Sequence, residues 1–142
     1  MWTIPAERMK ADREHKVPLS DQAMELLAEL REITGHCKHL FPKIIKKGTG
    51  FDDSGTVSEA TALQAIKRMG YDCHPHGFRR MASTYLHSLE DDDERPKFDT
   101  MWIEFALAHK DFSKTREAYN ASRYLKARTR MLQFYADQVM PR

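Results

Sequence analysis

Helical periodicity is the feature that most constrains the fold of this chain. Between Ser20 and Gly35, apolar residues recur at spacings of three and four: Ala23, Leu26, Leu27, Leu30 and Ile33. This pattern predicts a helix that buries one face, with Ser20 as its N-cap and Gly35 as its stop. Similar patterns predict a helix between Ser58 and Gly70, and further helices over residues 77–89, 98–108 and 123–139.

Short extended stretches accompany the helices. WTIP (2–5) and HKVPLS (15–20) flank a charged stretch, which indicates a β-hairpin. HLFP (39–42) is expected to be a strand and residues 43–56 a loop. The predicted fold class is therefore mainly α with a small antiparallel β element (α+β), and residues 1–142 are expected to form a single domain.

Composition excludes several classes of protein. No apolar run approaches the roughly 18 residues that a membrane span needs, and the first residues contain no apolar core of a secretory signal. Only two cysteines occur, Cys37 and Cys73, which argues against a disulfide framework. A reducing, cytoplasmic setting is expected.

Charge is unevenly distributed along the chain, although the formal net charge is only +2. Acidic residues concentrate in LEDDDERP (89–96), which predicts a solvated loop. Basic residues form three clusters: Lys43, Lys46 and Lys47; Arg79 and Arg80; and Arg123, Lys126, Arg128 and Arg130. Such clusters are compatible with a DNA-binding face, and they are also common on proteins that bind no nucleic acid.

The stretch HPHGFRRMAST (74–84) places His76 and Arg79 three positions apart where a helix is expected to begin. A helix N-terminus favours anions, and the planar fork of an arginine matches two phosphate oxygens. By itself this spacing is equally compatible with a solvated basic turn. His109 follows a later apolar helix, and Tyr119 comes ten positions after it. Together these groups suit a phosphate that carries developing negative charge and a tyrosine nucleophile.

These segments resemble a known family. HGFRRMAST, LAHK and REAYNASRYL look like the motifs of the tyrosine recombinases, most closely the prophage-type integrases. The opening WTIPAERMKADREHKVPLS is similar to the family's β-hairpin, which carries a lysine eight residues before a proline, as Lys10 precedes Pro18. HLFP and AIKRMGYD also look like family segments, so the resemblance covers essentially the whole chain.

The resemblance implies a role for each motif residue. Tyr119 would attack a DNA phosphodiester and form a 3′-phosphotyrosyl link, while Arg79 clamps the non-bridging oxygens. His76 would take part in proton transfer at the tyrosine, and His109 would donate a hydrogen bond to the scissile phosphate. Lys10 would be the general acid that protonates the leaving 5′-oxygen. The resemblance implies no metal and no nucleotide cofactor.

The resemblance also implies partners. Double-stranded DNA attachment sites, a homotetramer on DNA, and accessory DNA-bending or excision factors are expected, with no membrane partner. Site-specific recombination in prophage integration and excision is the implied function, in the cytoplasm of a bacterial host and in association with the nucleoid. Arg80, Lys43, Lys46 and Lys47 are the expected further DNA contacts.

Two departures from the family pattern affect these expectations. The family has a further arginine in a helix before the hairpin and an amino-terminal core-binding domain, and the chain starts after both. The 142-residue chain by itself is therefore expected to correspond to the later part of the catalytic domain and to cleave DNA poorly or not at all. In addition, 30 positions separate Arg79 from His109, so LEDDDERPKF resembles a local insertion.

Other interpretations remain open from the sequence. Two of them keep the DNA partner: a non-catalytic DNA-binding remnant and a type IB topoisomerase. The third is a zinc site, because GHCKH (35–39) and DCHPH (72–76) supply two cysteines and two histidines, although the usual C-x₂₋₄-C knuckle is missing. Tyr124 and Tyr135 are further tyrosines in the C-terminal segment, and their apolar spacing predicts packing roles.

Overall fold

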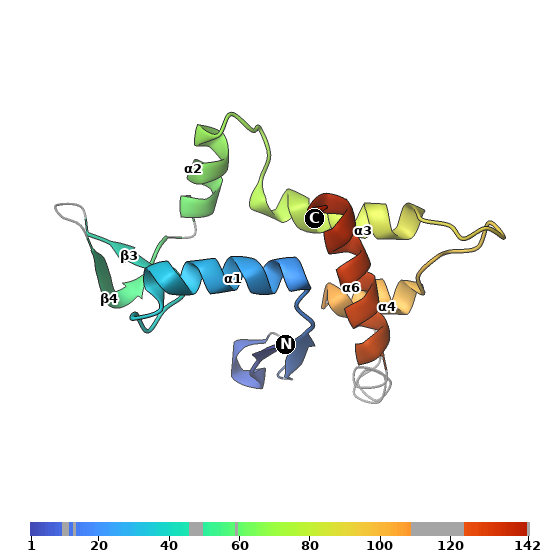
Figure 1. Cartoon of the computed structure of the whole chain (residues 1–142), viewed down its shortest axis with the longest axis horizontal. Coiled ribbons are helices and arrows are strands. Elements are labelled where there is room, and N and C mark those ends of the chain that lie inside the picture. The colour runs from blue at the N-terminus through green and yellow to red at the C-terminus, as the bar shows by residue number, and fades with distance from the viewer. Residues whose placement is uncertain (10–11, 13, 46–49, 59, 109–123, 142) are drawn as a thin grey trace. The chain divides into compact units, whose positions relative to one another are not determined.

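The computed structural model describes residues 1–9, 12, 14–45, 50–58, 60–108 and 124–141. The chain divides into two compact units (Figure 1): unit 1 comprises Met1–Gln22 and Arg79–Arg142, and unit 2 comprises Ala23–Phe78. The single domain over residues 1–142 stays a prediction. Within the described part of the chain, no helix is both long enough and apolar enough to cross a membrane.

The main helix of unit 2 ends where the sequence predicts. α1 runs over Asp21–Thr34, and the backbone N–H of Gly35 donates to the carbonyl oxygen of Arg31 at 2.8 Å. A Cβ at Gly35 would lie only 2.3 Å from that same oxygen, so no other residue fits this close approach. α2 runs over Ala60–Arg68 and is followed by Gly70 at φ +86°, a conformation that favours glycine.

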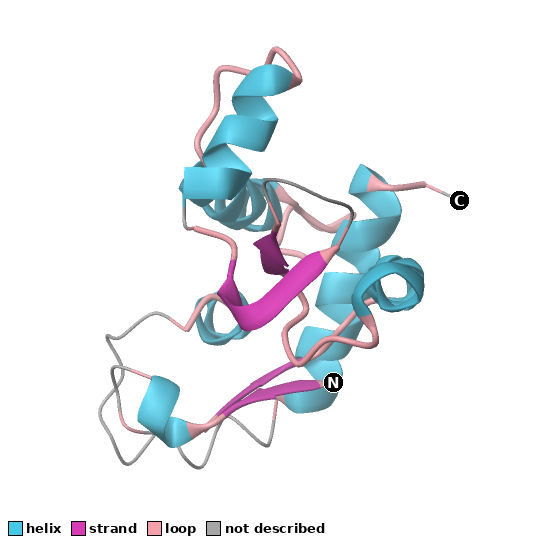
Figure 2. Cartoon of the chain, turned by 90° about the vertical axis from the view of Figure 1, so that its left-hand side faces the viewer, coloured by secondary structure: helices cyan, strands magenta, loops and turns pink. Residues whose placement is uncertain are grey.

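The strands of unit 2 differ from the prediction. β3 (Pro42–Ile44) pairs antiparallel with β4 (Phe51–Thr56), as Figure 2 shows. The strand expected over residues 39–42 is therefore wrong except at Pro42, where β3 begins. The loop expected over residues 43–56 is also wrong, because it contains the rest of β3 and all of β4. FDDSGT has little intrinsic β-propensity, so its strand conformation depends on pairing with β3.

The expected hairpin at the start of the chain is confirmed in unit 1. β1 (Trp2–Ile4) pairs antiparallel with β2 (His15–Val17), with Ile4 opposite His15, and the 3₁₀ helix η1 (Ala6–Arg8) lies in their connection. The two hairpins form two separate two-stranded sheets. The predicted class, mainly helical with a small antiparallel β element, is thus confirmed.

Three helices complete the described part of unit 1. α3 spans Pro75–Ser88 and enters this unit at Arg79, α4 spans Thr100–Ala106, and α6 spans Leu125–Val139. Asp99 caps α4 by accepting a hydrogen bond from the backbone of Met101 at 2.8 Å. α4 and α6 pack against each other.

The core of unit 1 is made by one buried side chain from each of these helices. Leu86, Ile103 and Met131 form a cluster with 0–3% of each side chain exposed. Phe105 is also buried, whereas Val139 at the end of α6 is 49% exposed. Met131 and Ala136 occupy the buried face of α6 instead.

A network of amide side chains holds α6 to the start of α1, within unit 1. Gln133 accepts a hydrogen bond from the backbone N–H of Asp21 at 2.9 Å and donates to Gln22 and Asp137, each at 2.9 Å. Gln22 is only 3% exposed and donates to Asp137 at 2.7 Å. Because both amides have partners, their burial costs little.

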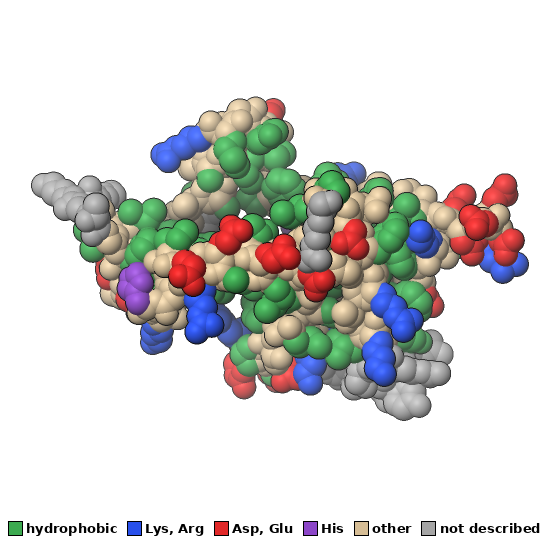
Figure 3. Space-filling model, in the orientation of Figure 1, with side chains coloured by type: hydrophobic (Ala, Val, Ile, Leu, Met, Phe, Trp, Pro, Cys, Tyr) green, Lys and Arg blue, Asp and Glu red, His purple; other side chains and the backbone are tan. Residues whose placement is uncertain are grey.

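The acidic stretch forms the solvated loop that the sequence predicts. Residues 90–97 are all exposed, and the Asp91 carboxylate accepts hydrogen bonds from the backbone of Asp93 and Arg95. An isolated bridge joins Glu90 to Pro96. Figure 3 shows the charged side chains gathered at the tip of this loop.

Candidate functional site

α3 carries the two residues of the H-x-x-R motif. Pro75 is its first residue, a position at which the missing N–H of proline costs nothing. His76 is exposed in the first turn, Arg79 is half-buried one turn later, and Arg80 is exposed. Residues three apart are neighbours on a helix surface. The boundary between the two units falls between Phe78 and Arg79, so the surroundings of Arg79 are those of unit 1.

Lys10, His109 and Tyr119 lie outside the described residues, as do Lys46 and Lys47. The described flanks of residues 109–123 are nevertheless informative. Tyr124, just before α6, lies with its ring 6.4 Å from the ring of Trp102 and 6.4 Å from that of Phe105, both on α4. α4 ends at Ala106, and Ala108 has φ +50° directly before His109. α4 therefore precedes this segment, and Tyr124, directly after it, packs on the same helix.

Strand β2 brings a further residue to Arg79. His15 is half-buried, and its ring makes a hydrogen bond to the backbone of Ala106 at the end of α4. Burial, and then the positive charges of Arg128 and Arg79, lower the pKa of His15 below its usual 6.5. The two arginines and the end of α4 therefore each interact with His15 of β2 in unit 1.

Arg128 is the most unusual side chain of unit 1. Only 1% of it is exposed, and its Nη2 donates a hydrogen bond to the carbonyl oxygen of Lys16 in β2. Its Nε is buried and has no hydrogen-bond partner among the described residues. Burial lowers the pKa of the guanidinium, which still keeps its charge at neutral pH.

The expectation that Arg128 belongs to a basic surface cluster is wrong, because the side chain points into unit 1 and bonds to β2. Neither Arg128 nor His15 was selected from the sequence as a site residue. A signal for Arg128 did exist. Position 128 falls between Leu125 and Leu132 on the apolar stripe of the helix, where a charge needs a buried partner.

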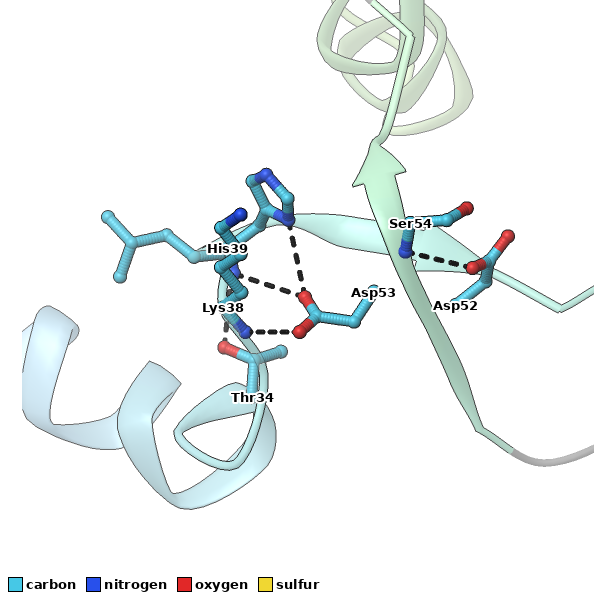
Figure 4. A network of polar contacts seen from close by, with 7 residues as sticks. Thr34, Lys38, His39, Asp52, Asp53 and Ser54 are labelled. Atoms are coloured by element: carbon cyan, nitrogen blue, oxygen red, sulfur yellow. Dashed lines mark hydrogen bonds and ion pairs between the residues drawn. The ribbon is translucent and has the colours of Figure 1, made fainter.

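Unit 2 contains a second polar network, which is structural (Figure 4). The Asp53 carboxylate accepts hydrogen bonds from the backbone N–H groups of Lys38 at 2.6 Å and His39 at 3.2 Å, and it meets His39 Nδ1 at 3.2 Å. The Lys38 N–H and then the contacts with His39 lower the pKa of Asp53. This network joins β4 to the turn after α1.

The zinc interpretation finds no assembled ligand set. Among the described residues, no three His, Cys, Asp or Glu side chains are grouped closely enough to hold a metal ion. One of the four candidate ligands, His39, has its Nδ1 turned to Asp53. The other three are Cys37, Cys73 and His76, all of which are described.

Lys43, expected to contact DNA, is exposed on β3.

The pKa of His15 predicts how the stability of unit 1 changes with pH. Because the folded state lowers this pKa, the unfolded chain binds more protons, so stability is full above about pH 6.5 and falls as the pH drops through the folded value. Replacing His15 by Gln, which stays neutral, is expected to reduce this pH dependence. The two tryptophans, Trp2 and Trp102, both lie in unit 1.

Urea unfolding followed by tryptophan fluorescence at about pH 7.5 and about pH 5.5 measures this effect. Between about pH 7.5 and about pH 5.5, the urea concentration at the unfolding midpoint should fall more for the unsubstituted chain than for His15→Gln. Equal losses in the two proteins would contradict the assignment of the pH dependence to His15. His87, which is paired with Glu104 at 3.8 Å, is left unchanged in both proteins.

Comparison with known proteins gives a consistent set of relatives. The model of the "Phage integrase family" matches residues 1–126. Prophage integrase IntA of Escherichia coli K12 is 39% identical over 140 residues, which are 97% of this chain and 31% of that protein. Prophage integrase IntZ of the same strain is 39% identical over 139 residues, covering 96% and 31%.

The integrase of Enterobacteria phage P4 is 36% identical over 156 residues, covering 96% of this chain and 32% of that protein. The chain thus spans about a third of the length of these curated relatives. No solved structure matches it significantly.

Proposed function

Because the chain belongs to the phage integrase family, we propose that it forms part of the catalytic domain of a tyrosine recombinase. The whole protein would break and rejoin double-stranded DNA at attachment sites during prophage integration and excision. A homotetramer on DNA, accessory DNA-bending or excision factors, and a cytoplasmic, nucleoid-associated location belong to the same proposal.

In this proposal the Tyr119 oxygen attacks the scissile phosphorus. The new O–P bond joins the tyrosine to the 3′ side of the break, and the bond to the 5′-oxygen breaks. Lys10 gives its proton to that leaving oxygen, and His76 takes part in removing the tyrosine proton. Arg79 and His109 stabilise the charge on the non-bridging oxygens. Because the phosphotyrosyl ester retains the free energy of the broken phosphodiester bond, rejoining requires no nucleotide.

The observation that carries the proposal is the surroundings of Arg79. Half-buried on α3, it lies within electrostatic reach of His15 in β2, and His15 is bonded to the end of α4. The charge of Arg79 on α3, the His15 ring on β2 and the end of α4 therefore interact within unit 1, and this supports the proposal. A half-buried guanidinium suits a phosphodiester, because its planar fork can donate to two phosphate oxygens at once.

The test uses the chain in the place of the matching segment of prophage integrase IntA. This chimaera is mixed with a nicked duplex on which unmodified IntA forms a covalent adduct, and the nick allows the short 5′-hydroxyl strand to dissociate after cleavage. An adduct on a denaturing gel, with DNA attached through its 3′-phosphate, is expected. DNA binding without any adduct would favour the non-catalytic remnant.

A further inference from the structure

We propose that Arg128 and His15 are positioning residues that hold β2, and with it the hairpin connection containing Lys10, against the ends of the helices that flank residues 109–123. This inference rests on the proposed function, in which Lys10 is the general acid and Tyr119 the nucleophile. Neither Arg128 nor His15 is itself given a catalytic role.

The first argument is the bond between α6 and β2. Arg128 is 1% exposed and its Nη2 donates to the carbonyl oxygen of Lys16, which lies opposite Thr3 in the hairpin. Burying a guanidinium is costly unless it is bonded, and an apolar side chain of similar volume would fill the position without that cost. Packing alone therefore does not explain the arginine, whereas fixing the backbone of β2 does.

The second argument is the bond between the same strand and α4. The His15 ring is hydrogen-bonded to the backbone of Ala106, one residue along β2 from the carbonyl that Arg128 holds. A neutral imidazole that donates to a carbonyl keeps its other nitrogen as an acceptor. That acceptor nitrogen of the neutral ring is compatible with the positive charges of Arg79 on α3 and Arg128 on α6, which both act on His15.

The two bonds link the hairpin to both flanks of residues 109–123. α4 ends directly before His109, and α6 begins shortly after Tyr119. Tyr124 packs on α4 as well, so α4, α6 and β2 form one connected frame. A general acid must lie within hydrogen-bond reach of its oxygen, and a displacement of about 1 Å costs on the order of 10²-fold in rate. Loosening β2 should therefore impair the step that needs Lys10.

The first experiment measures hydrogen exchange in the 142-residue chain by itself. Arg128→Met is expected to speed exchange of the β1–β2 amides much more than exchange in α1, and Arg128→Lys, which can still donate to the Lys16 carbonyl, should restore part of the protection. Gln133→Ala is the matched control, because it also removes a bond from α6 to the first 22 residues but not to the hairpin. Unchanged hairpin exchange in Arg128→Met would overturn the proposal.

If Arg128→Met fails to fold, His15→Ala tests the proposal instead, because it removes the bond to Ala106 and leaves the bond between Arg128 and Lys16 in place. A lower protection factor of the hairpin amides in His15→Ala supports the proposal. So does a protection factor that falls with acid in the unsubstituted chain but not in the variant. Hairpin exchange equal to that of the unsubstituted chain at each pH contradicts it.

The second experiment uses the IntA chimaera and replaces the leaving 5′-oxygen by sulfur. A thiol has a pKa of about 8.5 and leaves without a general acid. Arg128→Met should lower the rate of adduct formation about 10²-fold on the oxygen substrate and recover on the sulfur substrate. Gln133→Ala should show no such selective recovery, because a general loss of stability affects both substrates equally.

Lys10→Ala distinguishes the general-acid role of Lys10 from the positioning role of Arg128. If sulfur fails to rescue Lys10→Ala, the proposed role of Lys10 as the general acid is wrong. If sulfur rescues Lys10→Ala but leaves Arg128→Met as slow as before, the general acid stands and the positioning role of Arg128 is refuted.

Discussion

Tyr119→Phe is expected to abolish the covalent adduct in the IntA chimaera, and Tyr124→Phe is expected to leave its amount near that of the unsubstituted protein. Phenylalanine has no oxygen to attack phosphorus, so the loss at residue 119 should be complete and not merely large. The two tyrosines lie five positions apart and both carry a phenol, which makes Tyr124 a matched control.

The structure gives Tyr124 a packing role. Its half-buried ring lies 6.4 Å from the rings of Trp102 and Phe105, and Tyr124→Phe preserves these contacts. Tyr124→Leu should instead reduce stability, because the aromatic contacts to α4 are lost. The reaction on the nicked duplex, followed by protease digestion and mass spectrometry, identifies the modified tyrosine. An adduct mapped to Tyr124, or one that persists in Tyr119→Phe, would overturn the assignment of the nucleophile.

The helices could be predicted from the sequence because their signals are local. The apolar spacing and the stop at Gly35 predict α1 and its end, and the close approach of Gly35 to Arg31 explains why the stop is a glycine. The expectation that this spacing marks a buried face is wrong at Leu26 and Ile33, which are 49% and 58% exposed. The start of α3 was expected after Pro75, whereas proline is in fact its first residue. Such errors are small because caps and prolines act on their own turn of helix.

The features that were missed depend on contacts between distant parts of the sequence. β4 contains two aspartates, a serine and a glycine, and it is a strand because β3 pairs with it and because Asp53 bonds to the turn after α1. Arg128 appeared to be one member of a basic cluster, and its partner, the carbonyl of Lys16, lies 112 positions away. No local pattern identifies such a partner. The motif spacing did select Arg79, whereas only the folded unit identifies His15 as a residue on which its charge acts.

Arg79→Lys is expected to slow adduct formation by about 10²–10³-fold in the chimaera, the usual cost of removing one preorganised donor from a site that stabilises developing charge. Lysine keeps the positive charge but lacks the planar fork that contacts two oxygens at once. Arg80→Lys is the matched control on the same helix, because Arg80 is exposed and a lysine there still attracts DNA. Its rate should stay within about tenfold of the unsubstituted protein.

Single-turnover rates and DNA affinities measured over a range of salt concentrations distinguish catalysis from binding. Both variants retain their charge, so the salt dependence of affinity should be the same in both, and only the chemical step should separate them. The charge near His15 is also retained in Arg79→Lys, so a change in the protonation of His15 does not account for the loss of rate. A rate unchanged in Arg79→Lys, or equally reduced in Arg80→Lys, would show that Arg79 contributes only general attraction for DNA. A loss confined to Arg79→Lys would instead locate the stabilisation of the scissile phosphate at Arg79 on α3, whose charge acts on His15 of β2.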